Sequence, residues 1–175
     1  IGLWLCAASA LIVIGQALAG RASEQSEEVD AEASRFGPAI VALLNDDDFG
    51  RARNPVFADA SARYLDTFRA MTADPNNGVI VAERDGAIIG CYQLTFIRGL
   101  SYTGGERAQI ESVRVASSLR GGGLGSAMMR DAIARARARG CHLVQLTTDV
   151  RRDHTRRFYE RLGFTASHHG MKLFL

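Results

Sequence analysis

A cluster of glycines between a strand-like and a helix-like segment limits the folds open to this chain. Gly121–Gly123 and Gly125 follow the strand-like stretch Ala108–Val115 and precede a helical pattern that runs to about Arg139. Glycine adopts positive φ readily and lets a ligand approach the backbone closely. A helix N-terminus presents unpaired N–H groups and a partial positive charge. Together these features predict a site for an anion such as phosphate, with a plain flexible turn as the alternative.

Two common phosphate-binding motifs fit this segment poorly. A P-loop requires a Lys after its second glycine, and the segment contains none. The dinucleotide-binding spacing G-x-G-x-x-G starts at Gly121, but Ser126 stands at its third glycine. Asp149 after the following strand keeps that interpretation open. The order of the other predicted elements argues against it, because only one strand–helix–strand crossover is present.

Hydrophobic patterns outside the turn predict a sheet flanked by helices. Strands are expected at 79–83, 87–96, 108–115 and 143–147, with Asp85-Gly86 as a hairpin turn between the first two. A weak strand is expected at 29–34 and two short strands in 164–175. Helices are expected to start at Pro38 and to cover 57–71 and 155–162, in addition to the one after the glycines. The element order indicates an α/β or α+β fold with a mixed sheet.

Charge divides the chain unevenly. Residues 1–20 contain no charged side chain, so all 21 Lys and Arg and all 19 Asp and Glu lie in the other 155 residues. We therefore divide the chain into an apolar segment (1–20), an acidic linker (21–28) and one domain (29–175). The net charge of +2 is too small to indicate nucleic-acid binding by itself.

The apolar segment has three interpretations. It is long enough for a membrane-spanning helix or a signal sequence, and Ala17-Leu18-Ala19 resembles a cleavage site. It is also compatible with a non-native extension, or with an extra helix packed on the domain. We expect the domain in the cytoplasm, with inner-membrane anchoring through residues 1–20 as the alternative and a cleaved signal ranked last.

Cysteines and acidic residues give no metal-binding pattern. Cys6, Cys91 and Cys141 form no CxxC motif, and the latter two lie among apolar residues as small buried side chains would. Asp46–Asp48 lacks the spacing of a calcium loop, so we expect a solvated loop that weakly attracts a cationic amine.

Two motifs in order carry a family resemblance. Arg120–Gly125 (RGGGLG) matches R/Q-x-x-G-x-G/A, and Phe158–Phe164 (FYERLGF) follows about 30 residues later. The pair resembles the GNAT superfamily of acetyl-CoA-dependent N-acetyltransferases, over 29–175 in element order and 109–164 in motif detail. The resemblance implies a mixed, mostly antiparallel sheet whose two parallel strands splay apart. Thr155 and Arg152 depart from the Ala and Asn that are usual in the family.

The resemblance also implies the ligand and its site. Acetyl-CoA is the expected cosubstrate, without a metal, and would lie between splayed strands at 109–115 and 143–147. Its pantetheine arm would pair with the free strand edge near Val113 and Val115. The pyrophosphate would bind the backbone of the turn, comprising Arg120, Gly121, Gly122, Gly123, Leu124, Gly125 and Ser126.

Two side chains are candidates for proton transfer. Glu111 is the candidate general base, and strict alternation places it on the same strand face as Val113 and Val115 unless a bulge intervenes. A paired or edge-exposed Glu is the structural alternative. Tyr159 matches the family tyrosine that donates to the leaving thiolate, and a packed aromatic is its alternative.

The sequence thus favours an N-acetyltransferase that acts on an unidentified small-molecule or peptide amine. The alternatives are a non-catalytic nucleotide- or phosphate-binding module and a membrane-tethered interaction domain on the same fold. Nucleic acid is not an expected partner, a membrane is one only if residues 1–20 form an anchor, and a homodimer is possible.

Overall fold

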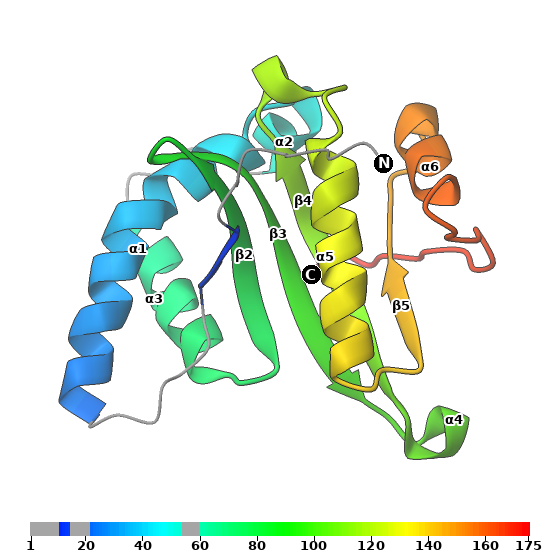
Figure 1. The fold of residues 1–175 in the computed structure, drawn as a ribbon, viewed down its shortest axis with the longest axis horizontal. Coiled ribbons are helices and arrows are strands. Elements are labelled where there is room, and N and C mark those ends of the chain that lie inside the picture. Colours follow the sequence, from blue (N-terminus) through cyan, green and yellow to red (C-terminus); the bar gives the residue numbers. More distant parts are fainter. Residues whose placement is uncertain (1–10, 15–21, 54–59) are drawn as a thin grey trace, which may run out of the picture.

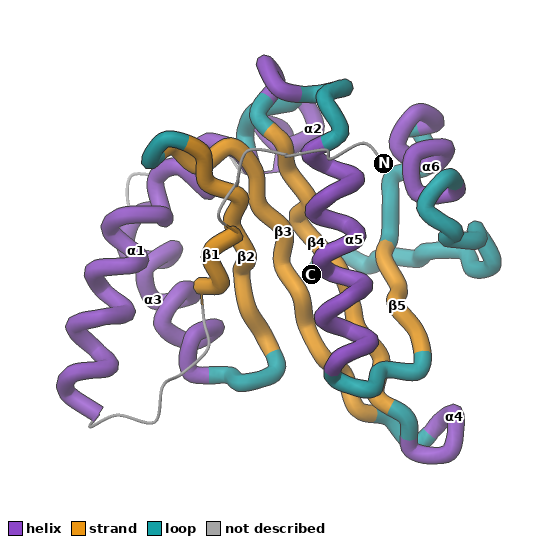
Figure 2. Tube along the Cα trace, in the orientation of Figure 1, coloured by secondary structure: helices purple, strands orange, loops and turns teal. Residues whose placement is uncertain are grey.

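A five-stranded mixed sheet forms the centre of the molecule (Figures 1 and 2). The computed structural model describes residues 11–14, 22–53 and 60–175. Strands follow one another in chain order across the sheet, and all neighbours are antiparallel except β4 and β5, which are parallel. The strands are β1 (Leu11–Ile14), β2 (Asn77–Arg84), β3 (Ala87–Arg98), β4 (Glu106–Val115) and β5 (Leu143–Leu146). The predicted mixed, mostly antiparallel sheet is confirmed.

Helices cover both faces of this sheet (Figure 1). Helices α1 and α3 pack on one face, and α5 crosses the other face over β3 and β4. The short α6 follows β5. The helices are α1 (Ala22–Leu44), α2 (Asp48–Arg53), α3 (Ala60–Ala73), α4 (Ser101–Gly104), α5 (Leu124–Ala138) and α6 (Asp153–Glu160), and a 3₁₀ turn occupies Ser117–Leu119.

The α5 face contains the larger apolar core. Met128, Met129, Ala132 and Ala136 of α5 are buried against alternate residues of the strands. Helix α5 approaches β3 closely at Gly90, where an added Cβ would lie 2.8 Å from Met128 Sδ. This close packing fixes the N-terminus of α5 beside the end of β4.

Two local turns behave as the sequence predicts. Asp85 and Gly86 have φ of 53° and 77°, the left-handed pair that joins β2 to β3 in a tight hairpin. Gly140 has φ of 81° directly after α5, where a glycine relieves the steric clash of a left-handed cap.

The N-terminal helix corrects two predictions. Residues 29–34 are helical, because Ala33, Phe36 and Leu43 recur at helical spacing and are buried, and the latter two pack on the sheet. Pro38 lies inside α1 and does not start it. Proline lacks an N–H, so the Ser34 carbonyl loses its usual helical donor, and packing on the sheet maintains the helix.

The C-terminal residues correct a third prediction. Residues 164–175, all of which the structure describes, form no strand. Apolar side chains in this tail are exposed, so no buried face supports an extended ladder there; they are Met171, Leu173, Phe174 and Leu175.

The apolar N-terminal segment is described only in part. Leu11–Ile14 forms the edge strand β1 against β2, whereas residues 1–10 and 15–21 lie outside the described residues. Helix α1 includes residues 22–28, so this part of the predicted linker is helical. Of the helices that the structure describes, none has the length and hydropathy to span a membrane. The domain boundaries at residues 20 and 28 stay a prediction.

Candidate active site

Strands β4 and β5 separate at one end of the sheet. Their parallel pairing runs from Arg107 opposite Leu143 to Ile110 opposite Leu146 and stops there. Strand β4 continues to Val115, and no described strand pairs with that edge beyond Ile110. The splay predicted between these strands is therefore present, and it exposes backbone hydrogen-bonding groups beside the glycine turn.

A β-bulge at Ser112 changes which way the end of β4 faces. Ser112 has φ of 52°, and the register with β3 shifts between Cys91 and Gln93. Before the bulge, Glu111 lies opposite Gln93, whose side chain faces α1 and α3. The predicted alternation is thus interrupted.

The bulge, which was the stated alternative to strict alternation, decides the position of Glu111. Val113 and Val115 pack against the α5 core, whereas Glu111 lies on the opposite face of the sheet and is exposed. No ion pair engages Glu111 among the residues that the structure describes. The carboxylate is therefore accessible from the α1 and α3 side, next to the strand edge exposed by the splay.

Backbone groups at Val113 and Val115 face the splay. The amide of Ala116 donates to Ile89 of β3, so the alternation of strand amides directs those of Val113 and Val115 to the other edge. Arginine side chains cover the two carbonyls there, with Arg114 Nη1 2.9 Å from the Val113 oxygen and Arg120 Nε 3.1 Å from the Val115 oxygen. The edge therefore offers N–H donors in a positively charged setting.

The glycine turn forms an open cradle at the N-terminus of α5. Gly121 and Gly123 have φ of 82° and 86°, and a Cβ built on either meets no described residue within 4 Å except its chain neighbours. Gly123 is the N-cap of α5, and no side chain in the described part of the chain caps this helix. The amides of Leu124, Gly125 and Ser126 belong to the first helical turn and have no intrahelical acceptor.

The amide of Arg120 is less available than predicted. It donates to the Ser117 oxygen at 3.3 Å, and the Gly122 amide donates to the Leu119 oxygen at 3.4 Å, within the turn. The geometry of the cradle suits a phosphate group at residues 121 and 123–126.

The α1–α2 loop, residues 45–47, anchors this turn. Asp46 Oδ2 accepts from the Ser117 amide at 2.7 Å and from Arg120 Nη2 at 3.1 Å. Arg120 Nη2 also donates to the Asp46 carbonyl at 2.9 Å. Arg120 therefore connects the end of β4 to the loop, a function of its side chain that sequence reasoning missed.

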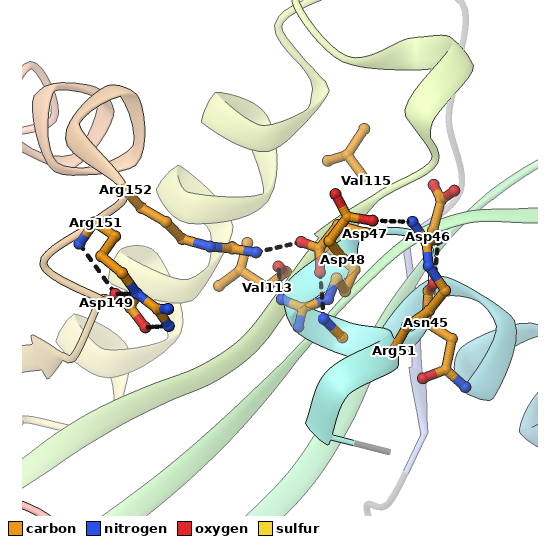
Figure 3. A network of polar contacts seen from close by, with 12 residues as sticks. Asn45, Asp46, Asp47, Asp48, Arg51, Val113, Val115, Asp149, Arg151 and Arg152 are labelled. Atoms are coloured by element: carbon orange, nitrogen blue, oxygen red, sulfur yellow. Dashed lines mark hydrogen bonds and ion pairs between the residues drawn. The ribbon is translucent and has the colours of Figure 1, made fainter. Parts of the chain in front are cut away.

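A second ion pair holds the same loop to α6 (Figure 3). Arg152 donates to Asp47, and the Gly50 amide also donates to the Asp47 carboxylate. Burial alone would raise the pKa of Asp47, but these hydrogen bonds and the arginine charge outweigh it and hold the pKa below its usual value. Arg152 also stacks on Phe49, 4.3 Å from the ring centroid.

These contacts correct the prediction of a solvated acidic loop. Asp46 and Asp47 are committed to the glycine turn and to α6, so only Asp48 of the three is exposed. Asp149, the acidic residue that kept the dinucleotide-binding interpretation open, accepts three hydrogen bonds from Arg151, one from its amide and two from its guanidinium (Figure 3).

Tyr159 lies in α6 among aromatic side chains. Its ring makes edge contacts with Phe158 and Phe164, at centroid distances of 5.1 and 5.9 Å. Burial raises the pKa of Tyr159 above 10.0, and the charges of Arg114 and Arg152 offset this only in part. Its hydroxyl makes no hydrogen bond with the described part of the chain, so a proton donor remains available.

Comparison with known families identifies this arrangement. The model of the "Acetyltransferase (GNAT) family" matches residues 39–164, which include the splayed strands, the glycine turn and α6. The chain belongs to the GNAT acetyltransferase family.

Two characterised relatives of this GNAT chain are N-acetyltransferases. Aminoalkylphosphonate N-acetyltransferase of Salmonella typhimurium is 31% identical over 105 residues, 60% of this chain and 68% of the relative. Glucosamine 6-phosphate N-acetyltransferase of Trypanosoma brucei brucei is 36% identical over 88 residues. That match covers 50% of this chain and 58% of the relative, little more than half its length.

Solved structures agree on the fold. A protein described as a transcriptional regulator from Bacillus halodurans C-125 has a TM-score of 0.74 and 37% identity, covering 95% of this chain and all of that one. A predicted acetyltransferase of Clostridium acetobutylicum, solved with acetyl-CoA, has a TM-score of 0.64 and 18% identity. That match covers 85% of this chain and 91% of the other, and it shows a common fold alone.

Proposed function

We propose that this GNAT protein transfers the acetyl group of acetyl-CoA to the amine of an acceptor by direct attack on the thioester. The observation that carries the proposal is the open glycine cradle beside the splayed ends of β4 and β5. Both characterised relatives are named as N-acetyltransferases of amine-bearing compounds, which supports an amine acceptor.

The residues present suit acetyl-CoA, whose thioester would supply the acetyl group. Amides at Gly121, Gly123 and the first turn of α5 would bind the pyrophosphate through hydrogen bonds and the helix dipole. Amides at Val113 and Val115 would bind the pantetheine arm and polarise the thioester oxygen. These groups are preorganised, because Arg120 fixes the end of β4 to the α1–α2 loop.

Glu111 is proposed as the general base. Alkylammonium groups titrate near ~10, so a neutral-pH acceptor must lose a proton before attack. The exposed Glu111 carboxylate lies one residue before the bulge, on the face opposite α5, and would accept that proton directly or through a water.

The buried Cys91 is not suited to carry the acetyl group as a covalent intermediate. Burial raises the pKa of the Cys91 thiol to about 12, so the thiolate needed as a nucleophile is scarce at neutral pH. Direct transfer from thioester to amine requires no such intermediate.

Tyr159 is proposed as the proton donor to the leaving thiolate, and its replacement by Phe tests this. We expect kcat to fall about 100-fold, within the range for loss of one general acid. The Kd for acetyl-CoA should change little, because the ring and its aromatic contacts remain. Since the raised pKa keeps the phenol protonated, the wild-type rate should decline through this group only above pH 10.0. An unchanged kcat would remove Tyr159 from the mechanism.

Calorimetry and thiol release together test the function. We expect acetyl-CoA and CoA to bind in preference to ATP and NAD, and thiol release to require both acetyl-CoA and an amine. Binding of ATP or NAD alone would instead support a nucleotide-binding module. Binding of acetyl-CoA without turnover on a broad amine panel would support a domain that has lost catalysis.

A further inference from the structure

A large cavity lies on the face of the sheet opposite α5. It has a volume of about 540 Å³ and is lined by residues of α1, α3 and the adjoining strands β2, β3 and β4. This volume falls within the range of about 300–1,000 Å³ that is typical of small-molecule sites. The walls come from two layers of the fold, the helix layer of α1 and α3 and the sheet.

The wall of the cavity is apolar and carries no charge among the described residues that line it. Leu44 of α1, Phe68 and Met71 of α3 and Val79 of β2 are representative. An anionic group such as a phosphate needs cationic or multiple N–H partners when it leaves water. This wall offers neither, whereas it suits an alkyl or aryl group.

One side of the cavity adjoins the proposed catalytic residue. Gln93 and Ser112 both line the cavity. Gln93 lies directly opposite Glu111 on β4, and Ser112 is the bulge residue next to Glu111. Directly opposed residues of antiparallel strands have Cβ atoms about 5 Å apart on the same face. An amine that leaves the cavity at Gln93 therefore reaches Glu111 within the length of a side chain.

We propose that the acceptor is a primary amine with an uncharged apolar body, which fills this cavity while the amino group projects toward Glu111. The inference rests on the proposed acetyltransferase function and specifies its substrate class. It separates this chain from the two characterised relatives, whose named substrates carry a phosphonate or a phosphate.

A panel of amines at saturating acetyl-CoA tests the substrate class through thiol release. Butylamine to octylamine should show kcat/KM rising about fourfold per methylene until the cavity is filled, as expected for burial of apolar surface. 2-Phenylethylamine should fall on the same trend. 2-Aminoethylphosphonate and glucosamine 6-phosphate should be at least about 100-fold poorer than octylamine.

A cationic side chain introduced into the cavity lining tests the inference, with the same substitution at a neighbouring non-lining position as the control. Val41→Arg on α1 introduces a cation into the cavity lining, whereas Ala42→Arg adds the same charge at the next, exposed position, which does not line it. The quantity to compare is kcat/KM for octylamine divided by kcat/KM for 2-aminoethylphosphonate. Val41→Arg should lower this ratio at least about 10-fold, and Ala42→Arg should leave it unchanged. Thr67→Arg, at an exposed lining position of α3, repeats the test if Val41→Arg folds poorly.

The outcomes separate the two proposals. Turnover that favours the phosphonate- or phosphate-bearing amines would overturn the apolar-acceptor inference while acetyl transfer stands. The same holds if kcat/KM does not change with chain length from butylamine to octylamine. A ratio unaffected by both Val41→Arg and Thr67→Arg would also overturn it. Absence of turnover with every amine, despite bound acetyl-CoA, would overturn the acetyltransferase function and this inference with it.

Discussion

Replacing Gly123 with Asp is expected to weaken acetyl-CoA binding at least about 100-fold, whereas Asn at the same position should weaken it less than about 10-fold. Gly123 has φ of 86° at the N-cap of α5. Asp and Asn tolerate this left-handed conformation better than other side chains, at about 1 kcal/mol or slightly more. The two variants have the same shape and differ by one negative charge.

The charge accounts for the difference between these variants. A carboxylate at residue 123 would compete for the helix amides and repel the pyrophosphate within a Debye length of about 8 Å. Apart from the two chain neighbours, no atom of the described residues lies within 4 Å of a Cβ at this position, so we expect neither variant to disturb packing. Isothermal titration calorimetry with acetyl-CoA gives the affinities, and thermal unfolding confirms that both variants fold. Equal affinities of Asp and Asn variants would contradict an anion site in the cradle.

Glu111→Gln is expected to lower kcat about 100- to 1,000-fold at neutral pH. The amide keeps the size of the side chain but does not accept the ammonium proton. Acetyl-CoA affinity should be unchanged, because the proposed ligand contacts involve the backbone of β4 beyond the bulge. The residual rate should keep rising with pH toward ~10, where the amine loses its proton unaided.

Glu83→Gln is the matched control for this experiment. Glu83 also lies on a strand, pairs with the exposed Arg35 at 3.2 Å, and is separated from β4 by β3. Removing such a pair changes stability by less than about 1 kcal/mol and should leave kcat unaffected. A Glu111→Gln enzyme that retains the wild-type rate and pH profile would assign the proton transfer to another group.

Local backbone preferences made several elements predictable. Asp85-Gly86 and Gly140 adopt left-handed φ in the positions expected for a hairpin and a helix cap. The glycines of the turn and the helix after them were predictable for the same reason, since positive φ and helix propensity depend on neighbouring residues. The helix through residues 29–34 was not, because helix formation there depends on burial of Phe36 and Leu43 against the sheet.

The sequence by itself determined the family motifs, the order of most strands and helices, and the candidates Glu111 and Tyr159. Only the tertiary structure decided which face of the sheet Glu111 occupies, because a single bulge at Ser112 reverses the alternation. The tertiary structure also decided that Asp46 and Asp47 form ion pairs that hold the α1–α2 loop to the glycine turn and to α6. Their partners Arg120 and Arg152 are 74 and 105 residues away in the chain, beyond the reach of any local pattern.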